Sequence, residues 1–135
     1  MPLEMLKSLV TTLILALALV QALGMAQVRG YVRLLPFKRR QLRLSHRWGG
    51  IVVLVLTLVV ALICAFGVGY APYSLRAKAH VAMGVLAILT LLLKVTIARR
   101  FRRYLRFTLA LGATAGLLIL GTFATSALWY FVQVA

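Results

Sequence analysis

Apolar residues dominate four long stretches of this chain of 135 residues, and basic residues gather in the shorter stretches between them. The apolar stretches cover about residues 9–28, 49–68, 79–97 and 107–132. Each approaches the roughly 20 residues that an α-helix needs to cross the hydrocarbon core of a bilayer. A strand in lipid would leave backbone groups unpaired, so the pattern predicts an all-α fold. We expect a four-helix transmembrane bundle that forms one integral membrane domain over residues 1–135.

Residue composition also indicates a membrane protein. Hydrophobic residues make up 64% of the chain and charged residues 13%, which leaves too little polar surface for a soluble domain of this length. Sixteen Lys and Arg residues stand against one acidic residue, Glu4. Because the cations lie between apolar stretches, they are typical of the cytoplasmic side of a membrane and of contact with anionic lipid headgroups. We expect the chain to reside in the lipid bilayer of the bacterial inner membrane and to bind no nucleic acid.

The connections between the apolar stretches differ in charge, and the difference predicts the orientation of the chain. Residues 29–48 carry seven cations and residues 98–106 carry five, whereas residues 69–78 carry two. The more basic connections should face the cytoplasm, which places both termini on the outer side. Residues 37–47 are expected to form a short basic helix on the membrane surface. The first stretch is expected to stay as a helix, because the cations that follow it disfavour its cleavage as a signal peptide.

Two histidines are the candidate functional residues. Each lies where an apolar stretch begins and is followed four residues later by a glycine: His46 with Gly50, and His80 with Gly84. A residue at i+4 lies on the same face of a helix, and glycine there leaves room for a flat macrocycle beside the imidazole. Haem b is held by imidazoles in helical bundles, and an ionisable residue within a membrane is a candidate for function by default. The spacing therefore indicates haem b as the cofactor, with His46 and/or His80 as metal ligands and the two glycines beside it.

The two histidines are predicted to lie too far apart to bind the same iron. Consecutive membrane helices run antiparallel, which places His46 near the inner face and His80 near the outer face. About 20 residues at roughly 1.5 Å per residue separate their depths by roughly 25–30 Å. Each site would need a second ligand, for which the chain offers Met25 near His46 and Cys64 near His80. A like histidine in a homodimer and a residue of a partner subunit are the alternatives.

Several polar and small residues have more ordinary interpretations. Either histidine could be a polar contact between helices or an interfacial anchor. Lys94 is expected to extend to the inner interface, and Lys94 with Arg47 could instead pair with a haem propionate. The last stretch carries a small-residue face, expected to pack within the monomer rather than against a second subunit: Gly112, Gly116 and Gly121.

The shortage of acidic residues excludes several kinds of chemistry. With Glu4 alone, the chain has no carboxylate pair for acid–base catalysis and no carboxylate-rich metal site. It also has no glycine-rich phosphate-binding loop and no nucleophile with an obvious base. A stand-alone enzyme is therefore not predicted, and the chain would be at most an electron-transfer subunit.

The histidine segments also carry a family resemblance, which runs from Ser45 to Val132. The residues that carry it are Ser45-His46-Arg47-Trp48-Gly49, Arg76-Ala77-Lys78-Ala79-His80 with Gly84, Lys94, and Thr125-Ser126-Ala127-Leu128-Trp129-Tyr130-Phe131. In these the chain resembles a group of small, uncharacterised bacterial four-helix membrane proteins, similar in plan to the cytochrome b561 and ferric-reductase-like haem bundles. The resemblance implies transmembrane electron transfer, with His46 and His80 as haem ligands. In that group a further histidine often precedes the cysteine of the second helix, whereas this chain has Leu62-Ile63-Cys64 and lacks that second ligand for a haem at His80.

These observations favour a b-type cytochrome-like membrane subunit that passes electrons through haem. Its partners would be quinone and either a second copy of the chain, as a homodimer, or a larger redox complex. The alternative is a non-catalytic accessory subunit of a larger membrane complex, with no haem of its own and with the histidines as polar contacts. A transporter or channel is disfavoured, because no apolar stretch contains a run of polar residues to line a path.

Overall fold

The computed structural model describes residues 3–68 and 74–135, and every regular element in this part of the chain is helical. The α-helices are α1 (Leu3–Val28), α2 (Arg39–Ile63), α3 (Leu75–Arg100), α4 (Thr108–Thr125) and the short α5 (Ala127–Val134). A π-helical turn (η1, Cys64–Val68) follows α2, and a 3₁₀ helix (η2, Arg102–Phe107) precedes α4. The described residues contain four helical segments that are long and apolar enough to cross a membrane. The all-α four-helix prediction is confirmed, and the side of the membrane on which the termini lie stays a prediction.

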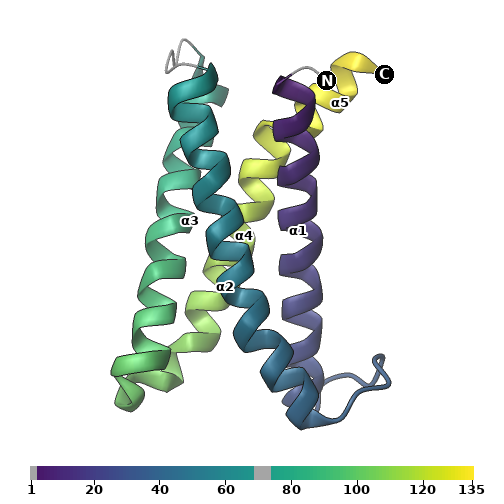
Figure 1. Ribbon diagram of the computed structural model, residues 1–135, viewed down its shortest axis with the longest axis vertical. Helices are drawn as coiled ribbons and strands as arrows, with labels where there is room; N and C mark the ends of the chain where they lie inside the picture. The colour runs from purple at the N-terminus through teal and green to yellow at the C-terminus, as the bar shows by residue number, and fades with distance from the viewer. Residues whose placement is uncertain (1–2, 69–73) are drawn as a thin grey trace.

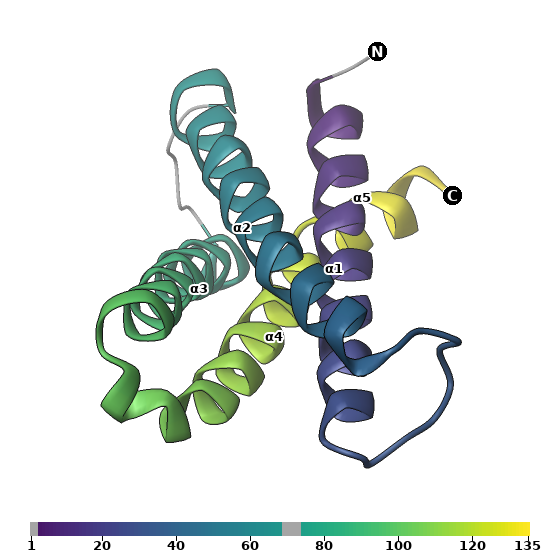
Figure 2. The same ribbon diagram turned by 60° about the horizontal axis from the view of Figure 1, so that its bottom comes forward.

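The helices pack mainly in two pairs. α1 packs along α2, and α3 packs along α4, while α1 also contacts α4 and α5. α2 runs obliquely across the bundle, so that it lies beside α3 at one end and beside α1 at the other (Figure 1). The turned view shows α3 and α4 adjacent and α2 crossing toward α1 (Figure 2). The beginning of α1 and the end of α5 lie at the same end of the bundle (Figure 1), as expected for four helices that alternate in direction.

The core lies at the centre of the bundle, where the long helices meet. Its buried residues come from all four of them: Ile14, Val53, Leu54, Ala87, Leu91, Ala115 and Ile119. Many of the large apolar side chains outside this cluster are exposed. Such a surface suits contact with lipid tails, which agrees with an integral membrane protein.

The second helix begins earlier than hydropathy alone predicts, at Arg39 instead of near residue 49. The side-chain oxygen of Gln41 accepts a hydrogen bond from the N–H of Lys38 at 3.1 Å. Leu42 is buried, with 5% of its surface exposed, and faces Gly24 of α1. Burial of Leu42 against α1 stabilises the first turns of α2 as part of the bundle. The expected separate helix on the membrane surface is therefore wrong, because α2 continues through these residues without a break.

The fourth apolar stretch contains a break that hydropathy does not predict. α4 ends at Thr125, and α5 begins at Ala127 after Ser126, whose φ of −125° and ψ of −80° are not helical. The N–H of Ser126 bonds to the carbonyl of Phe123 at 3.3 Å. The carbonyl of Thr122 therefore lacks the N–H that a continuing helix would supply.

Two of the small residues on α4 face α3, as expected for packing within the monomer. A Cβ atom built at Gly121 would lie 2.5 Å from the sulfur of Met83, and one built at Gly112 would lie 3.3 Å from Nζ of Lys94. Gly116 differs, because no atom of the described residues would lie within 4 Å of a Cβ there. The close contact between α3 and α4 thus uses two of the three glycines.

Candidate functional site

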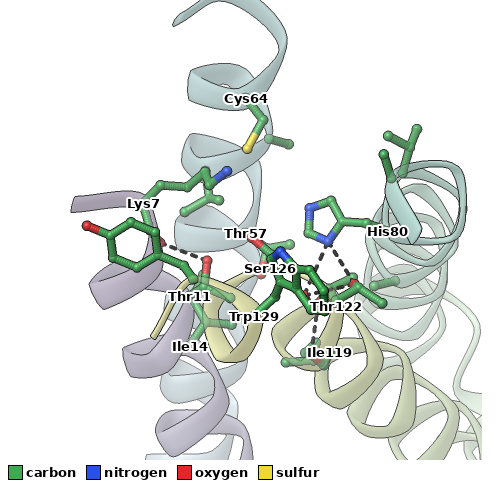
Figure 3. A pocket seen from close by; sticks show the side chains of 18 of the residues that line it. Lys7, Thr11, Ile14, Thr57, Cys64, His80, Ile119, Thr122, Ser126 and Trp129 are labelled. Carbon is green, nitrogen blue, oxygen red and sulfur yellow. Dashed lines mark hydrogen bonds between the residues drawn. The ribbon is translucent and has the colours of Figure 1, made fainter. Parts of the chain in front are cut away.

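His80 occupies the second turn of α3 and points toward the break in the fourth helical segment (Figure 3). Its Nδ1 atom lies 3.2 Å from the carbonyl oxygen of Thr122 and 3.1 Å from the hydroxyl oxygen of Thr125. A carbonyl oxygen only accepts hydrogen bonds, so we assign the imidazole proton to Nδ1. The other ring nitrogen, Nε2, keeps its lone pair and points away from these partners (Figure 3).

Side chains of α3 stabilise the break. The hydroxyl of Thr125 donates to the carbonyl of Gly121 at 2.8 Å, which leaves its lone pairs for the N–H of His80. The guanidinium of Arg76 donates to the carbonyl of Thr125 and lies 4.9 Å from the centre of the Trp129 ring. The last carbonyls of a helix lack intrahelical partners and carry partial negative charge. A cation and an imidazole N–H are therefore favourable at this helix end.

A cavity of about 750 Å³ lies beside His80, between α1, α2, α3 and the broken fourth segment. Small-molecule and cofactor sites typically have roughly 300–1,000 Å³. The wall includes Gly84, one of the predicted residues, and most of its surface is apolar, as at Ile14 and Ile119. Cys64 lines the same cavity (Figure 3), in agreement with its expected depth near that of His80.

Charged groups border this cavity. Lys7 of α1 lines it and pairs with Glu4 at a distance of 3.0 Å. The side chain of Lys7 is 14% exposed, whereas that of Glu4 is 47% exposed. Arg76 lines the cavity as well. Glu4 lines the cavity too, so the mostly apolar space is bordered by two cations and one carboxylate and keeps a net positive charge, which suits a ligand with an apolar body and anionic groups.

His46 has a different environment, two turns into α2. Its Nε2 atom lies 3.5 Å from Nζ of Lys94. An ammonium group only donates, so Nε2 must accept and the imidazole proton lies on Nδ1. The Nδ1 atom is buried near the backbone of Gln21 and makes no hydrogen bond of good geometry within the described part of the chain. In this arrangement His46 offers no free lone pair to a metal.

Lys94 lies against its neighbouring helices, and its expected position at the inner interface stays a prediction. Its side chain turns into the bundle toward His46 and passes close to Gly112 of α4. The reason is the bare backbone of Gly112, which leaves space between α3 and α4 for the ammonium group. Lys94 thus serves as the partner of an imidazole on another helix.

The two glycines at the predicted spacing face different surroundings. A Cβ atom at Gly84 would make an ordinary contact of 3.9 Å with Thr122, whereas none of the described residues lies within 4 Å of one at Gly50. The neighbouring Gly49 is the tightly packed position, because a Cβ there would lie 1.9 Å from Nε2 of Gln21. Sequence reasoning missed this contact. The signal that could have found it is Gln21, an amide within the first apolar stretch.

The structure does not bring the two histidines together, in agreement with the prediction. Lys7 shares the cavity of His80, and Gln21 shares a smaller cavity with His46. These two α1 residues are about four turns apart, which is roughly 20 Å along a helix. Met25, the expected neighbour of His46, is not among the described residues that line that smaller cavity.

Metal binding by protein ligands alone is not supported in the described residues, where no group of three or more His, Cys, Asp or Glu side chains could hold an ion. Haem brings its own four nitrogen ligands and requires only axial ligands from the protein. The Nε2 atom of His80, beside a cavity of suitable volume, could serve as one such ligand. The residues around His80 therefore fit haem better than a bare metal ion.

Comparison with known proteins identifies a family. The chain matches the model of a family of unknown function (DUF6529) over residues 2–135, and it belongs to that family. No curated protein and no solved structure matches it. The comparisons thus give no similarity to cytochrome b561 or to ferric reductases, although the helical bundle is compatible with such a plan.

Proposed function

We propose that this member of the DUF6529 family is a b-type cytochrome-like subunit of the bacterial inner membrane, with haem b held by His80. The observation that carries the proposal is the free Nε2 of His80 beside a cavity of about 750 Å³. Metal-binding histidines almost always donate their other N–H to a carbonyl or carboxylate, which fixes the ring and its tautomer. The bond from Nδ1 of His80 to the carbonyl of Thr122 is of this kind. When bound, haem b would supply one-electron transfer.

The other residues that line the cavity suit the porphyrin ring and the propionates of a haem. Gly84 on the wall adds no side chain beside the imidazole, and Ile14 and Ile119 provide apolar surface. Lys7 and Arg76 border the cavity and would pair with the propionates. Cys64 would supply a second ligand, because it lines the same cavity. A residue of a second copy or of a partner subunit is the alternative ligand.

Of the two histidines, His80 alone would bind the haem iron. The Nε2 atom of His46 faces the ammonium group of Lys94, and a metal there would displace that contact and lie beside a cation. We therefore assign His46 and Gly50 no part in haem binding. The electron partner would be a quinone or a larger redox complex.

The test is the absorption spectrum of protein produced with ample haem and purified in detergent. We expect a Soret band that shifts on reduction, almost complete loss of this band in His80→Ala, and its retention in His46→Ala. Absence of the band from the wild-type protein would overturn the proposal. Loss in His46→Ala with retention in His80→Ala would also overturn the assignment to His80.

The alternative function is that of a non-catalytic accessory subunit in which both histidines are polar contacts between helices. The pairing of His46 with Lys94 across two helices favours it. This function predicts no Soret band in the wild-type protein. It also predicts that His46→Ala and His80→Ala both weaken assembly with the partner complex.

A further inference from the structure

We propose that the short 3₁₀ helix η2 binds the phosphate group of an anionic phospholipid. η2 (Arg102–Phe107) joins α3 to α4 at the end of the bundle where α2 begins (Figure 1). Every residue from Arg99 to Phe107 is exposed, and five of these nine residues are arginine. The other four are Phe101, Tyr104, Leu105 and Phe107. The inference goes beyond the proposed function, because it requires no haem.

The geometry of η2 sorts these residues into rows. A 3₁₀ helix has about three residues per turn, so side chains three residues apart are aligned. Arg103 and Arg106 therefore share one row, and Tyr104 and Phe107 share the next. The ring centroids of Tyr104 and Phe107 lie 6.3 Å apart, which agrees with this alignment. η2 thus presents a row of guanidinium groups beside a row of aromatic rings.

Each guanidinium group of the first row lies over a ring of the second. The Cζ atom of Arg103 lies 4.8 Å from the centre of the Tyr104 ring. The Cζ atom of Arg106 lies at the same distance, 4.8 Å, from the centre of the Phe107 ring. A guanidinium group that stacks on a ring keeps the N–H groups on its edge free to donate.

No acidic side chain of the described residues is placed to accept from these two guanidinium groups. The only acidic residue of the chain, Glu4, lies in the first turn of α1 and pairs with Lys7. The beginning of α1 lies at the opposite end of the bundle from η2 (Figure 1). The edges of the two guanidinium groups therefore remain available to an anion from outside the chain.

The surroundings of η2 favour a lipid as the source of that anion. Both α3 and the segment that begins with η2 are long and apolar enough to cross a membrane, so the turn between them lies near the membrane surface. Exposed aromatic rings are typical of the headgroup region, and Phe101 and Phe107 are 48% and 45% exposed. A phospholipid would match both rows, with its phosphate on the guanidinium groups and its acyl chains beside the rings. A free phosphate or an acidic peptide would leave the rings in water.

The same charges select among phospholipids. The ammonium group of a zwitterionic headgroup would lie beside several arginine side chains, so a lipid with net negative charge is favoured. Hydrogen bonds also hold η2 in place. The N–H of Tyr104 donates to the carbonyl of Phe101 at 2.9 Å, and the hydroxyl of Thr108 donates to the carbonyl of Leu105 at 2.6 Å. A site that is ordered before the lipid arrives lowers the entropic cost of binding.

The test is native mass spectrometry of the purified protein in detergent, titrated separately with phosphatidylglycerol and with phosphatidylcholine of the same chain length. We expect wild type to bind phosphatidylglycerol about tenfold more tightly. The double variant Arg103→Gln/Arg106→Gln should lose most of this preference. The matched control Arg39→Gln/Arg40→Gln removes two exposed cations at the same end of the bundle and should keep it. Absence of the preference in wild type, or equal loss in the two double variants, would overturn the inference.

Two charge-preserving variants distinguish the rows of η2 from net charge. Arg103→Lys/Arg106→Lys removes the planar N–H edges, and Tyr104→Leu/Phe107→Leu removes the stacking. Each should lower the affinity for phosphatidylglycerol by about threefold or more. If both bind phosphatidylglycerol as wild type does, the rows do not form the site and the inference is overturned.

Competition and labelling complete the test. Inorganic phosphate or a polyglutamate peptide should not displace phosphatidylglycerol, and displacement by either would overturn the assignment to a lipid. His80→Ala should keep the lipid preference, so that failure of this site and failure of haem binding are distinguishable. If the η2 variants do not fold, phosphatidylglycerol with a photoreactive acyl chain replaces them, with label expected within residues 99–108 of wild type. Label confined to other residues would overturn the inference.

Discussion

The two histidine segments have the same local pattern but opposite chemistry. At one end of the bundle, His80 donates its Nδ1 proton to a backbone carbonyl and presents Nε2 beside a large cavity. At the other end, Nε2 of His46 faces an ammonium group, and the protonated Nδ1 is buried against the backbone of Gln21. A His-x-x-x-Gly spacing thus leaves open whether an imidazole acts as ligand or donor. The group opposite each ring decides it.

The difference originates in the partner helices. Opposite His80, the break at Ser126 leaves the carbonyl of Thr122 without its helical N–H, which provides an acceptor for the imidazole. Opposite His46, the bare backbone of Gly112 admits the ammonium group of Lys94, which provides a donor. An acceptor beside Nδ1 of His80 and a donor beside Nε2 of His46 leave the proton on Nδ1 in both rings, but they determine whether the lone pair of Nε2 is free.

The largest effect is expected at Thr125, whose hydroxyl is one of the two acceptors that face Nδ1 of His80. Thr125→Val removes a hydroxyl that lies 3.1 Å from Nδ1 of His80, and loss of such a partner weakens metal binding by about tenfold or more. We expect this loss of haem affinity, measured by haem titration followed at the Soret band. Thr114→Val is the matched control, since its hydroxyl bonds to the carbonyl of Ala110 in the same helix. Equal affinity in the two variants would show that Thr125 does not position His80.

A smaller effect is expected from the cation at the break. Arg76→Gln removes the guanidinium that bonds to the carbonyl of Thr125 and stacks on Trp129. We expect the free energy of unfolding to fall by about 1 kcal/mol, measured by denaturation in mixed micelles. Lys78→Gln, which removes an exposed cation on the same helix, should change it by less than about 0.5 kcal/mol. If both variants lose the same stability, the break is not held by Arg76.

The smallest effect is expected for the contact between His46 and Lys94. A double-mutant cycle with His46→Leu and Lys94→Leu should give a coupling energy of about 0.6 kcal/mol, the average for polar contacts between membrane helices. The same cycle with His80→Leu and Lys94→Leu should give less than about 0.3 kcal/mol, because these residues lie at different ends of the bundle. A coupling of His80 with Lys94 as large as that of His46 would contradict the assignment of partners.

Sequence patterns predicted the helices more fully than the site. Hydropathy located four helical segments, but it missed the early start of α2, which depends on burial of Leu42 against α1. It also missed the break at Ser126, where the chain has neither proline nor glycine and the stabilising groups come from α3. Of the predicted site residues, His80 and Gly84 line one cavity. The contact of Gly49 with Gln21 was also missed: the amide of Gln21 within an apolar stretch was its one signal in the sequence, and its partner lies on another helix.

The sequence by itself determined the number of membrane helices, their alternation and the placement of the two histidines at opposite ends. These properties follow from apolar length and chain direction, because the bilayer imposes a fixed thickness and every backbone group must be paired within it. Only the tertiary structure decided which histidine has a free lone pair, which cavity each one faces, and where Lys94 points. Those properties depend on groups of other helices, the carbonyl of Thr122 for His80 and the ammonium of Lys94 for His46. A proton on an imidazole nitrogen responds to whatever lies within hydrogen-bond distance, and that distance is set by helix packing rather than by neighbours along the chain.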